Sequence, residues 1–234
     1  DFDPHKHNVV FFSGSVTEYA AIDDLNKADT IFNSQYEAVN AISEWLSNYK
    51  DVRFYLRLHP NTKKRFKSEY NKWLILVEQL KGKVCFIDSD SSVDSYALAA
   101  HSDKVIAHMS NMGIESVMLD TASIVVGNAV YKGLGSNYVP RNIEECRTFV
   151  TDMHLRAKPK IGAYKYGYHH MTWGIPYKRF KPHHRFYGKY EGQNLEESYK
   201  RNTSTHIKYL LLTYPRYLRK KLNIRKKISQ VLNA

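Results

Sequence analysis

Cysteine is scarce in this sequence, and the residue patterns that would use it are missing. The 234 residues include only two cysteines, Cys85 and Cys146, and each stands in an apolar run. No CxxC or HExxH pairing occurs. Two such thiols are too few for a disulfide scaffold or a metal site, so we expect a reducing compartment and no bound metal.

Long apolar runs and targeting patterns are missing as well. No apolar stretch approaches the roughly 18 residues that cross a bilayer, and the first residues show no signal-peptide pattern. The composition is otherwise that of a globular protein, with 43% hydrophobic and 25% charged residues. We therefore expect a soluble, cytoplasmic chain that can lie on the inner membrane as a peripheral protein but does not span it.

Acidic residues are missing from the last part of the chain. From Arg201 onward there are nine basic residues and no acidic one, so this segment supplies +9 of the net charge of +12. Residues 216–232 place these charges among Leu218, Leu222, Ile228 and Leu232, which favours contact with an anionic membrane surface. The alternative is a terminal helix whose apolar positions pack back on the sheet. The nearly neutral body argues against nucleic acid as a partner.

Five short runs rich in β-branched and aromatic residues alternate with helix-like stretches. We expect strands at 8–12, 52–58, 83–87, 104–108 and 123–127, and helices at about 30–49, 62–81, 93–101, 111–119 and 141–156. This alternation predicts an α/β fold class, a Rossmann-like and mainly parallel sheet with helices on both faces.

The pattern changes after about residue 157. Residues 157–194 are dense in Tyr, His and Lys without a clean period, which predicts an irregular segment wrapped over the core or onto a partner. Helix-like sequence returns after it and is interrupted at Pro215. We expect a Rossmann-like domain over 1–156, the irregular aromatic and basic segment over 157–194, and C-terminal helices with a basic amphipathic tail over 195–234.

Candidate binding residues follow each of the five predicted strands. The carboxyl ends of parallel strands share one edge of the sheet, where hydroxyls, glycines, a histidine and helix N-termini can hold a phosphate and a ribose. Taken singly, each residue also has a structural explanation as a cap or a turn. The candidates are Ser13, Gly14, Ser15 and Glu18; Arg57, His59 and Pro60; Ser92, Asp94 and Ser95; Ser110, Asn111, Met112, Gly113 and Glu115; and Tyr131.

Several of these motifs together resemble the capsule polysaccharide biosynthesis family. The likeness covers about residues 8–140 and includes "VVFFSGSVTEYAA", "RFYLRLHPNTKKR" and "HSDKVIAHMSNMGIESVML". Asn111 and the "LDTAS" turn depart from the family pattern. The residues that match it are Arg57, His59, Pro60, Ser92, Asp94, Ser95, Ser110, Gly113, Glu115 and Tyr131.

The resemblance implies the nucleotide-sugar-binding half of a GT-B glycosyltransferase in capsule or lipopolysaccharide biosynthesis. The donor would be a CMP- or UDP-linked sugar and the acceptor a glycan or lipid-linked glycan, with no cofactor and no metal. His59 and Arg57 would be catalytic and would face the leaving phosphate. The N–H groups of 111–113 and the Ser110 hydroxyl would hold that phosphate, and Glu115 would hold the ribose.

Three questions stay open at this point. GT-B enzymes have a second, acceptor-binding domain, which this chain lacks unless residues 157–234 supply it. An epimerase-like or hydrolase-like GT-B relative would use the same edge of the sheet. A nucleic-acid-binding module would instead use the Tyr, Lys and His of 164–190 as a stacking surface.

Overall fold

The computed structural model describes residues 2–15, 30–65, 67–173, 179–184 and 187–194. The chain divides into two compact units, Asp1–Trp173 and Gly174–Ala234. Glu18 and the basic tail 216–232 lie outside the described residues, so the expectations placed on them stay predictions. Among the described residues, no helix combines the length and the apolar character needed to cross a membrane.

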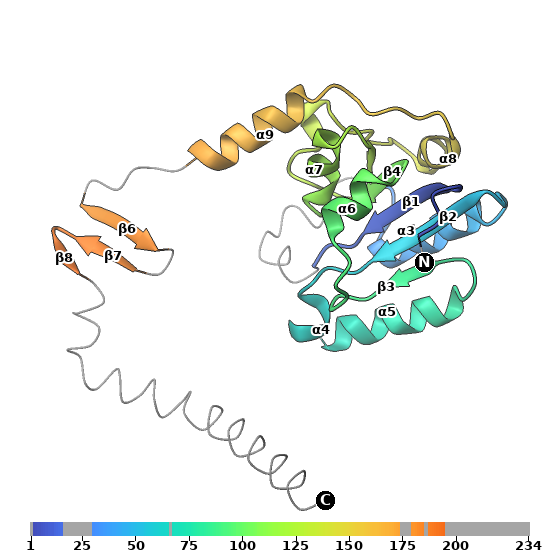
Figure 1. Ribbon diagram of the computed structural model, residues 1–234, viewed down its shortest axis with the longest axis horizontal. Coiled ribbons are helices and arrows are strands. Elements are labelled where there is room, and N and C mark those ends of the chain that lie inside the picture. Colours follow the sequence, from blue (N-terminus) through green and yellow to red (C-terminus); the bar gives the residue numbers. More distant parts are fainter. Residues whose placement is uncertain (1, 16–29, 66, 174–178, 185–186, 195–234) are drawn as a thin grey trace, which may run out of the picture. The chain divides into compact units, whose positions relative to one another are not determined.

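The first unit is built on a five-stranded parallel sheet (Figure 1). Its strands are β1 (His7–Phe12), β2 (Val52–Arg57), β3 (Cys85–Ile87), β4 (Lys104–Ala107) and β5 (Ala122–Val125), in the spatial order β3-β2-β1-β4-β5. Every neighbouring pair is parallel. The predicted fold class is confirmed, because each apolar run of the sequence contains a strand; β1, β2, β4 and β5 are mostly buried, and β3 is half-buried.

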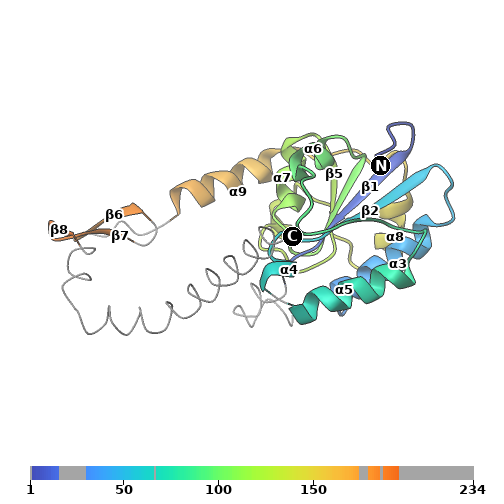
Figure 2. The same cartoon turned by 60° about the horizontal axis from the view of Figure 1, so that its bottom comes forward.

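Helices cover both faces of this sheet (Figure 2). One face carries α3 (Gln35–Leu46), α5 (Lys67–Gln79) and α8 (Ile143–Thr151), and the core beneath them includes Phe11, Val39 and Trp73. The other face carries α6 (Ser95–Ala100) and α7 (Met112–Met118), over a core that includes Val10, Leu98 and Val105. The short α4 (Thr62–Arg65) precedes α5, and the 3-10 helix η1 (Lys132–Leu134) follows β5.

Side-chain caps fix where the helices begin. Ser34 accepts a hydrogen bond from the Glu37 N–H at the start of α3, and Asn142 accepts one from the Glu145 N–H at the start of α8. Asp94 caps α6 by accepting from the N–H groups of Tyr96 and Ala97. Each cap pairs donors that the helix itself cannot satisfy, which makes the start of the helix specific.

Lys104 ties α8 to the amino end of β4. It is fully buried, and its Nζ donates to the Val150 carbonyl at 2.6 Å. Burial lowers the pKa of Lys104 to about 8, against the opposing influence of Asp152 and Asp103. The ammonium group thus holds the end of α8 at a cost in desolvation.

The expectation of an irregular segment over 157–194 is corrected by the structure. Residues Ile161–Thr172 form the helix α9, which contacts α7 and η1 and ends the first unit at Trp173 instead of near 156. In the second unit, β6 (Phe180–His184), β7 (Tyr187–Tyr190) and β8 (Gln193–Asn194) form an antiparallel sheet. No helical period was visible in α9 because apolar and aromatic side chains stand on two of its sides.

Candidate functional site at the carboxyl edge of the sheet

The strand order places a topological switch point between β1 and β4. The chain moves from β1 toward β2 and β3 on one side of the sheet, and then toward β4 and β5 on the other. The loops after β1 and β4 therefore diverge at the carboxyl edge, which is where open α/β sheets bind their ligands. Residues 13–15 and 108–113 flank this point.

Hydrogen bonds join the loop after β1 directly to the loop after β2. The Ser13 N–H donates to the Arg57 carbonyl at 3.1 Å, and the His59 N–H donates to the Ser13 Oγ at 2.9 Å. The His59 Nδ1 accepts from the Asn61 N–H at 3.3 Å, so a neutral His59 carries its ring proton on Nε2. The sequence placed Ser13 and His59 at the same edge, and the structure places them in contact.

Gly14 is held by a residue that sequence reasoning missed. The Gln35 Oε1 accepts from the Gly14 N–H at 3.0 Å, and the Gln35 Nε2 donates to the Gly14 carbonyl at 3.3 Å. Gln35 is the first residue of α3 and is 3% exposed. Ser15 is also buried, at 1% exposure. The first turn of the 13–15 loop is therefore fixed by α3.

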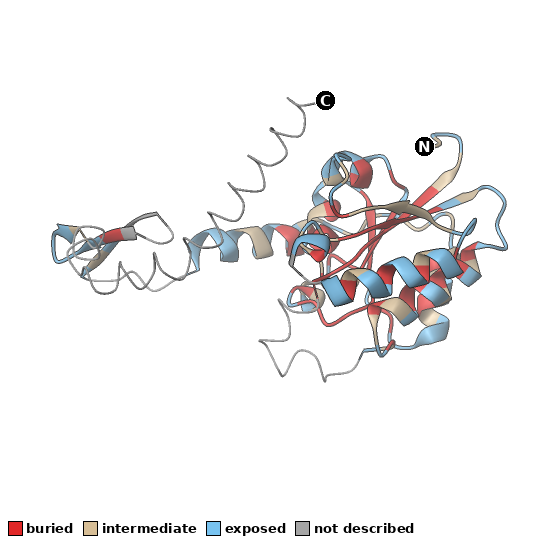
Figure 3. Cartoon of the chain, turned by 90° about the horizontal axis from the view of Figure 1, so that it is seen from below, coloured by how far each residue is buried: buried red, intermediate tan, exposed pale blue. Residues whose placement is uncertain are grey.

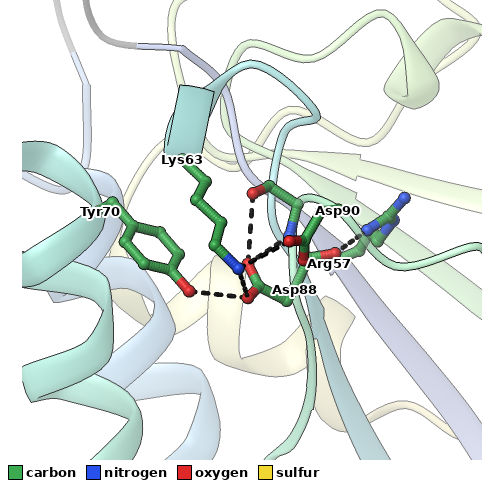
Figure 4. A network of polar contacts seen from close by, with 6 residues as sticks. Arg57, Lys63, Tyr70, Asp88 and Asp90 are labelled. Atoms are coloured by element: carbon green, nitrogen blue, oxygen red, sulfur yellow. Dashed lines mark hydrogen bonds and ion pairs between the residues drawn. The ribbon is translucent and has the colours of Figure 1, made fainter. Parts of the chain in front are cut away.

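Arg57 reaches into the loop that follows β3 (Figure 4). Its guanidinium donates to the backbone carbonyls of Asp88, Ser91 and Val93, and the Arg57 side chain is largely buried. Burial lowers the pKa of Arg57, while Asp88 and Asp90 oppose that shift. The Arg57 Nε is buried without a hydrogen-bond partner among the described residues. Through these contacts Arg57 holds the 88–93 loop in its conformation. The catalytic role of Arg57 stays a prediction.

The acidic residues of that loop are paired, as Figure 4 also shows. The Lys63 Nζ lies 2.6 Å from the Asp90 Oδ2 and 3.3 Å from the Asp88 Oδ2, and the Tyr70 hydroxyl donates to Asp88 at 2.7 Å. Burial raises the pKa of Asp88, but the hydrogen bonds from Tyr70, the Ser89 N–H and Lys63 together bring it below its usual value. Ser92 is exposed in the same loop.

Ser110 lies at the joint between β4 and α7. The Ser110 Oγ accepts from the Met112 N–H at 3.3 Å, and its carbonyl accepts from the Gly113 N–H and from the Tyr131 hydroxyl. Tyr131 is 1% exposed, so it supports the joint from beneath. A Cβ on Gly113 would overlap the Tyr131 hydroxyl and lie 2.8 Å from the Ala107 Cβ. Gly113 is therefore required by the packing of Tyr131 and β4.

Two tyrosines from other helices approach the start of α7. The Tyr96 hydroxyl of α6 donates to the Glu115 Oε2 at 3.0 Å, and this bond to the carboxylate raises the pKa of Tyr96. The Tyr166 hydroxyl of α9 donates to the Asn111 Oδ1 at 3.0 Å. Neither tyrosine was a candidate in the sequence, because only the fold brings α6 and α9 beside α7.

His108 is a further residue that sequence reasoning missed. It directly follows β4 at the switch point, where the sequence counted it as the last residue of the strand. Burial lowers the pKa of His108 to about 4, and no charged or hydrogen-bonded neighbour contributes to that shift. A Cβ on Gly127 would overlap the His108 carbonyl and lie 2.9 Å from its Cγ. The structure thus presents a neutral imidazole, backed by glycine, beside the Ser110 joint.

A cluster of metal ligands and a cavity are two features by which a binding site can be recognised. Among the described residues, no group of three or more His, Cys, Asp and Glu side chains could hold a metal ion. A cavity of about 370 Å³ lies at the amino edge of β2, opposite the candidate site, and its lining includes Lys6, Lys50, Arg53 and Lys83. The hydroxyl, imidazole and helix-start groups lie instead at the carboxyl edge, which makes that edge the candidate site.

This arrangement defines a class: a Rossmann-like α/β protein with polar loops at the carboxyl edge of its switch point. No protein-family model and no curated protein matches the sequence. The solved structures that resemble this chain include a transferase, a UDP complex and a glycosyl transferase domain.

The KpsC β-Kdo 2,4-transferase of Thermosulfurimonas dismutans is 20% identical, with a TM-score of 0.42 over 61% of this chain and 40% of that one. MnaA of S. aureus, solved with UDP, is 13% identical, with a TM-score of 0.45 over 70% of this chain and 45% of that one. The C-terminal domain of LpcC, a group 1 family glycosyl transferase of Francisella tularensis, is 15% identical, with a TM-score of 0.41 over 74% of this chain and 88% of that one. This chain therefore spans less than half the length of KpsC and MnaA.

Proposed function

We propose that the chain binds a nucleotide sugar at the carboxyl edge of its sheet and forms the donor-binding half of a GT-B-type glycosyltransferase. The observation that carries this proposal is the arrangement at the switch point. Ser13 and His59 are bonded to each other on the β1 side, and His108 with the Ser110 joint lies on the β4 side. These groups offer hydroxyls, a neutral imidazole and backbone donors within one edge of a parallel sheet.

The same groups suggest how transfer would proceed. As the glycosidic bond breaks, negative charge grows on the leaving phosphate, and donors fixed beforehand stabilise that charge. The His59 Nε2–H and the Ser110 hydroxyl are the proposed donors. Glu115, oriented by Tyr96, would accept from the ribose hydroxyls. Arg57 acts through the 88–93 loop in this scheme, because its guanidinium is bonded to the carbonyls of that loop.

The reaction also needs an acceptor, a donor and a second domain. The acceptor is a glycan or lipid-linked glycan of capsule or lipopolysaccharide, and the donor is a CMP- or UDP-linked sugar. The second domain of a GT-B enzyme supplies the acceptor site. Charge stabilisation by the side chains of this chain makes the step independent of metal.

A thermal-shift panel of CMP-, UDP- and GDP-sugars tests the binding step. A ligand at about 100 times its dissociation constant stabilises the fold by about 2.7 kcal/mol, which raises the Tm by about 5–10 °C for a chain of this size. His59→Ala and Glu115→Ala should remove most of this shift while changing the Tm of the unliganded protein little. The matched controls are His154→Ala and Glu44→Ala, which remove the same side chains from exposed positions elsewhere.

Four results would contradict the proposal. If no sugar nucleotide shifts the Tm, or if the His59 and control variants lose the shift equally, the edge is not the donor site. Release of free sugar without an acceptor, unchanged when glycan is added, would instead identify an epimerase-like or hydrolase-like relative. Steeply salt-dependent retention on a nucleic-acid column would favour the nucleic-acid module.

A further inference from the structure

Helix α9 has two opposite apolar sides, of which one is buried. Gly162 and Ala163 are buried against the first unit, and the Tyr166 ring lies edge-on to Tyr131 with centroids 5.4 Å apart. The Gly162 N–H donates to the Ser136 Oγ at 2.9 Å, and a Cβ there would overlap the Leu134 carbonyl. This side of α9 is closely fitted to η1 and α7, so the orientation of the helix is fixed.

The opposite side of α9 carries large apolar residues in solvent. Much of this helix is pale blue, the colour of exposed residues, in Figure 3. Positions 161, 164, 168 and 171 recur at helical spacing and lie within one narrow arc of the helix. We call them, with Trp173, the outer stripe: Ile161 is 59% exposed, Tyr164 57%, Tyr168 72%, Met171 89% and Trp173 78%.

The charges around the outer stripe have one sign. From Met153 to Trp173, where the first unit ends, the sequence contains four Lys and Arg residues and no Asp or Glu. Lys165 and His169 lie on α9 at the border of the stripe, and Arg156 precedes the helix as an exposed residue. Lys160 is neutralised by Asp120 at 2.7 Å, so the net charge of this region is carried mainly by the others.

These observations together indicate which kind of partner would bind the outer stripe. These basic residues repel a second copy of the same surface, but they attract an anionic one. Tyr and Trp favour the membrane interface, and Ile161 and Met171 add aliphatic surface that has no role in stacking on a nucleic-acid base. A helix of 12 residues is too short to span a bilayer and long enough to lie in its interface.

We propose that the outer stripe of α9 is a membrane-binding surface that inserts into the interface of an anionic bilayer. The stripe enters the headgroup region, while Lys165, His169 and Arg156 contact lipid phosphates beside it. This surface belongs to the first unit, and the proposal does not depend on the basic tail 216–232. The membrane proposal does not rest on the proposed nucleotide-sugar function, so a failure of that function would not contradict it.

Trp173 provides a local readout for the test. The chain has three tryptophans, and of the other two Trp73 is fully buried and Trp45 is partly buried in the core. The full chain is mixed with phosphatidylcholine vesicles, with or without about a third of phosphatidylglycerol. With the anionic vesicles we expect flotation, a blue shift of the emission, and quenching by brominated lipid; the neutral vesicles should give much weaker binding.

Variants separate α9 from the rest of the chain. The triple variant Tyr164→Ser, Tyr168→Ser and Met171→Ser changes only exposed side chains, and it should lower the partition constant about tenfold or more. The matched control Leu74→Ser with Ile75→Ser removes exposed apolar side chains from α5 and should bind as the unaltered chain does. Lys165→Glu should weaken binding to the anionic vesicles and leave binding to the neutral vesicles unchanged. Circular dichroism and Tm confirm that each variant folds.

Three outcomes would overturn the proposal. Flotation without quenching of Trp173, unchanged in the triple variant, would place membrane binding in another segment. A shift of the Trp173 emission by single-stranded DNA or an anionic polysaccharide, but not by vesicles, would identify a polymer-binding surface. Self-association that the triple variant abolishes, without vesicle binding, would make the outer stripe an interface between copies.

Discussion

A single methyl group at Gly113 tests how the joint between β4 and α7 is held. A Cβ there would overlap the Tyr131 hydroxyl and lie 2.8 Å from the Ala107 Cβ. Ala107 belongs to the central strand β4 and is fully buried, and Tyr131 is 1% exposed, so neither has space to move away. Gly113→Ala must therefore displace one of them.

The expected cost follows from three contributions. Overpacking of a buried site costs about 1–3 kcal/mol. Loss of the bond from the Tyr131 hydroxyl to the Ser110 carbonyl adds about 1 kcal/mol. The higher helix propensity of alanine returns up to about 1 kcal/mol. We expect Gly113→Ala to reduce the free energy of unfolding by about 2 kcal/mol, which lowers the Tm by about 4–8 °C.

A double-mutant cycle with Tyr131→Phe identifies the cause. Removing the hydroxyl relieves the main overlap, so Gly113→Ala should cost about 1 kcal/mol less in the Tyr131→Phe background. Urea unfolding monitored by circular dichroism measures each corner of the cycle. Gly167→Ala is the control: it lies within α9 with nothing within 4 Å of its Cβ, and it should be neutral or slightly stabilising. Equal costs of Gly113→Ala in both backgrounds would refute the role of Tyr131.

The other predictions concern charge. Because burial lowers the pKa of Lys104 to about 8, the unfolded chain binds more protons than the folded chain between pH 8 and 10. The free energy of unfolding should therefore rise with pH across that range by up to about 3 kcal/mol. Lys104→Met should flatten this rise, as measured by urea unfolding at several pH values. The pKa of His108, lowered to about 4, predicts the loss of up to about 3 kcal/mol as pH falls from 6.5 to 4, and His108→Gln should reduce this loss; an unchanged slope would show that His108 is not buried. Lys63→Met should raise the pKa of Asp88 in carboxyl-resonance titrations, whereas an unchanged value would mean that the ion pair is not formed in solution.

The sheet and its edge were predictable because their signals are local. Each strand is a short apolar run, and three of the helix starts, those of α3, α6 and α8, have a side-chain cap such as Asp94 before α6. Parallel strands then bring their carboxyl ends together without further information. For this reason Ser13, His59 and Ser110 were assigned to one edge from the sequence alone.

The supporting contacts were not predictable because they join residues far apart in the chain. The Arg57 guanidinium binds carbonyls of the 88–93 loop, and no residue pattern close to Arg57 in the sequence indicates this contact. Gln35 and Tyr166 reach Gly14 and Asn111 only after α3 and α9 have docked. His108 was hidden by its neighbours, since a histidine after three apolar residues looks like the end of a strand.

Helix α9 links the candidate site to the outer stripe through one rigid element. Its inner side donates from Tyr166 to Asn111 at the start of α7, and its outer side carries Tyr164 and Tyr168 in solvent. Adjacent helical residues point in different directions, so a helix held at Tyr166 cannot present Tyr164 differently without rotating as a whole. A rotation of α9 would therefore move the outer stripe and change the hydrogen bond from Tyr166 to Asn111 together. If the outer stripe binds a bilayer and the carboxyl edge binds a donor, as proposed, α9 would fix the orientation of that edge relative to the bilayer.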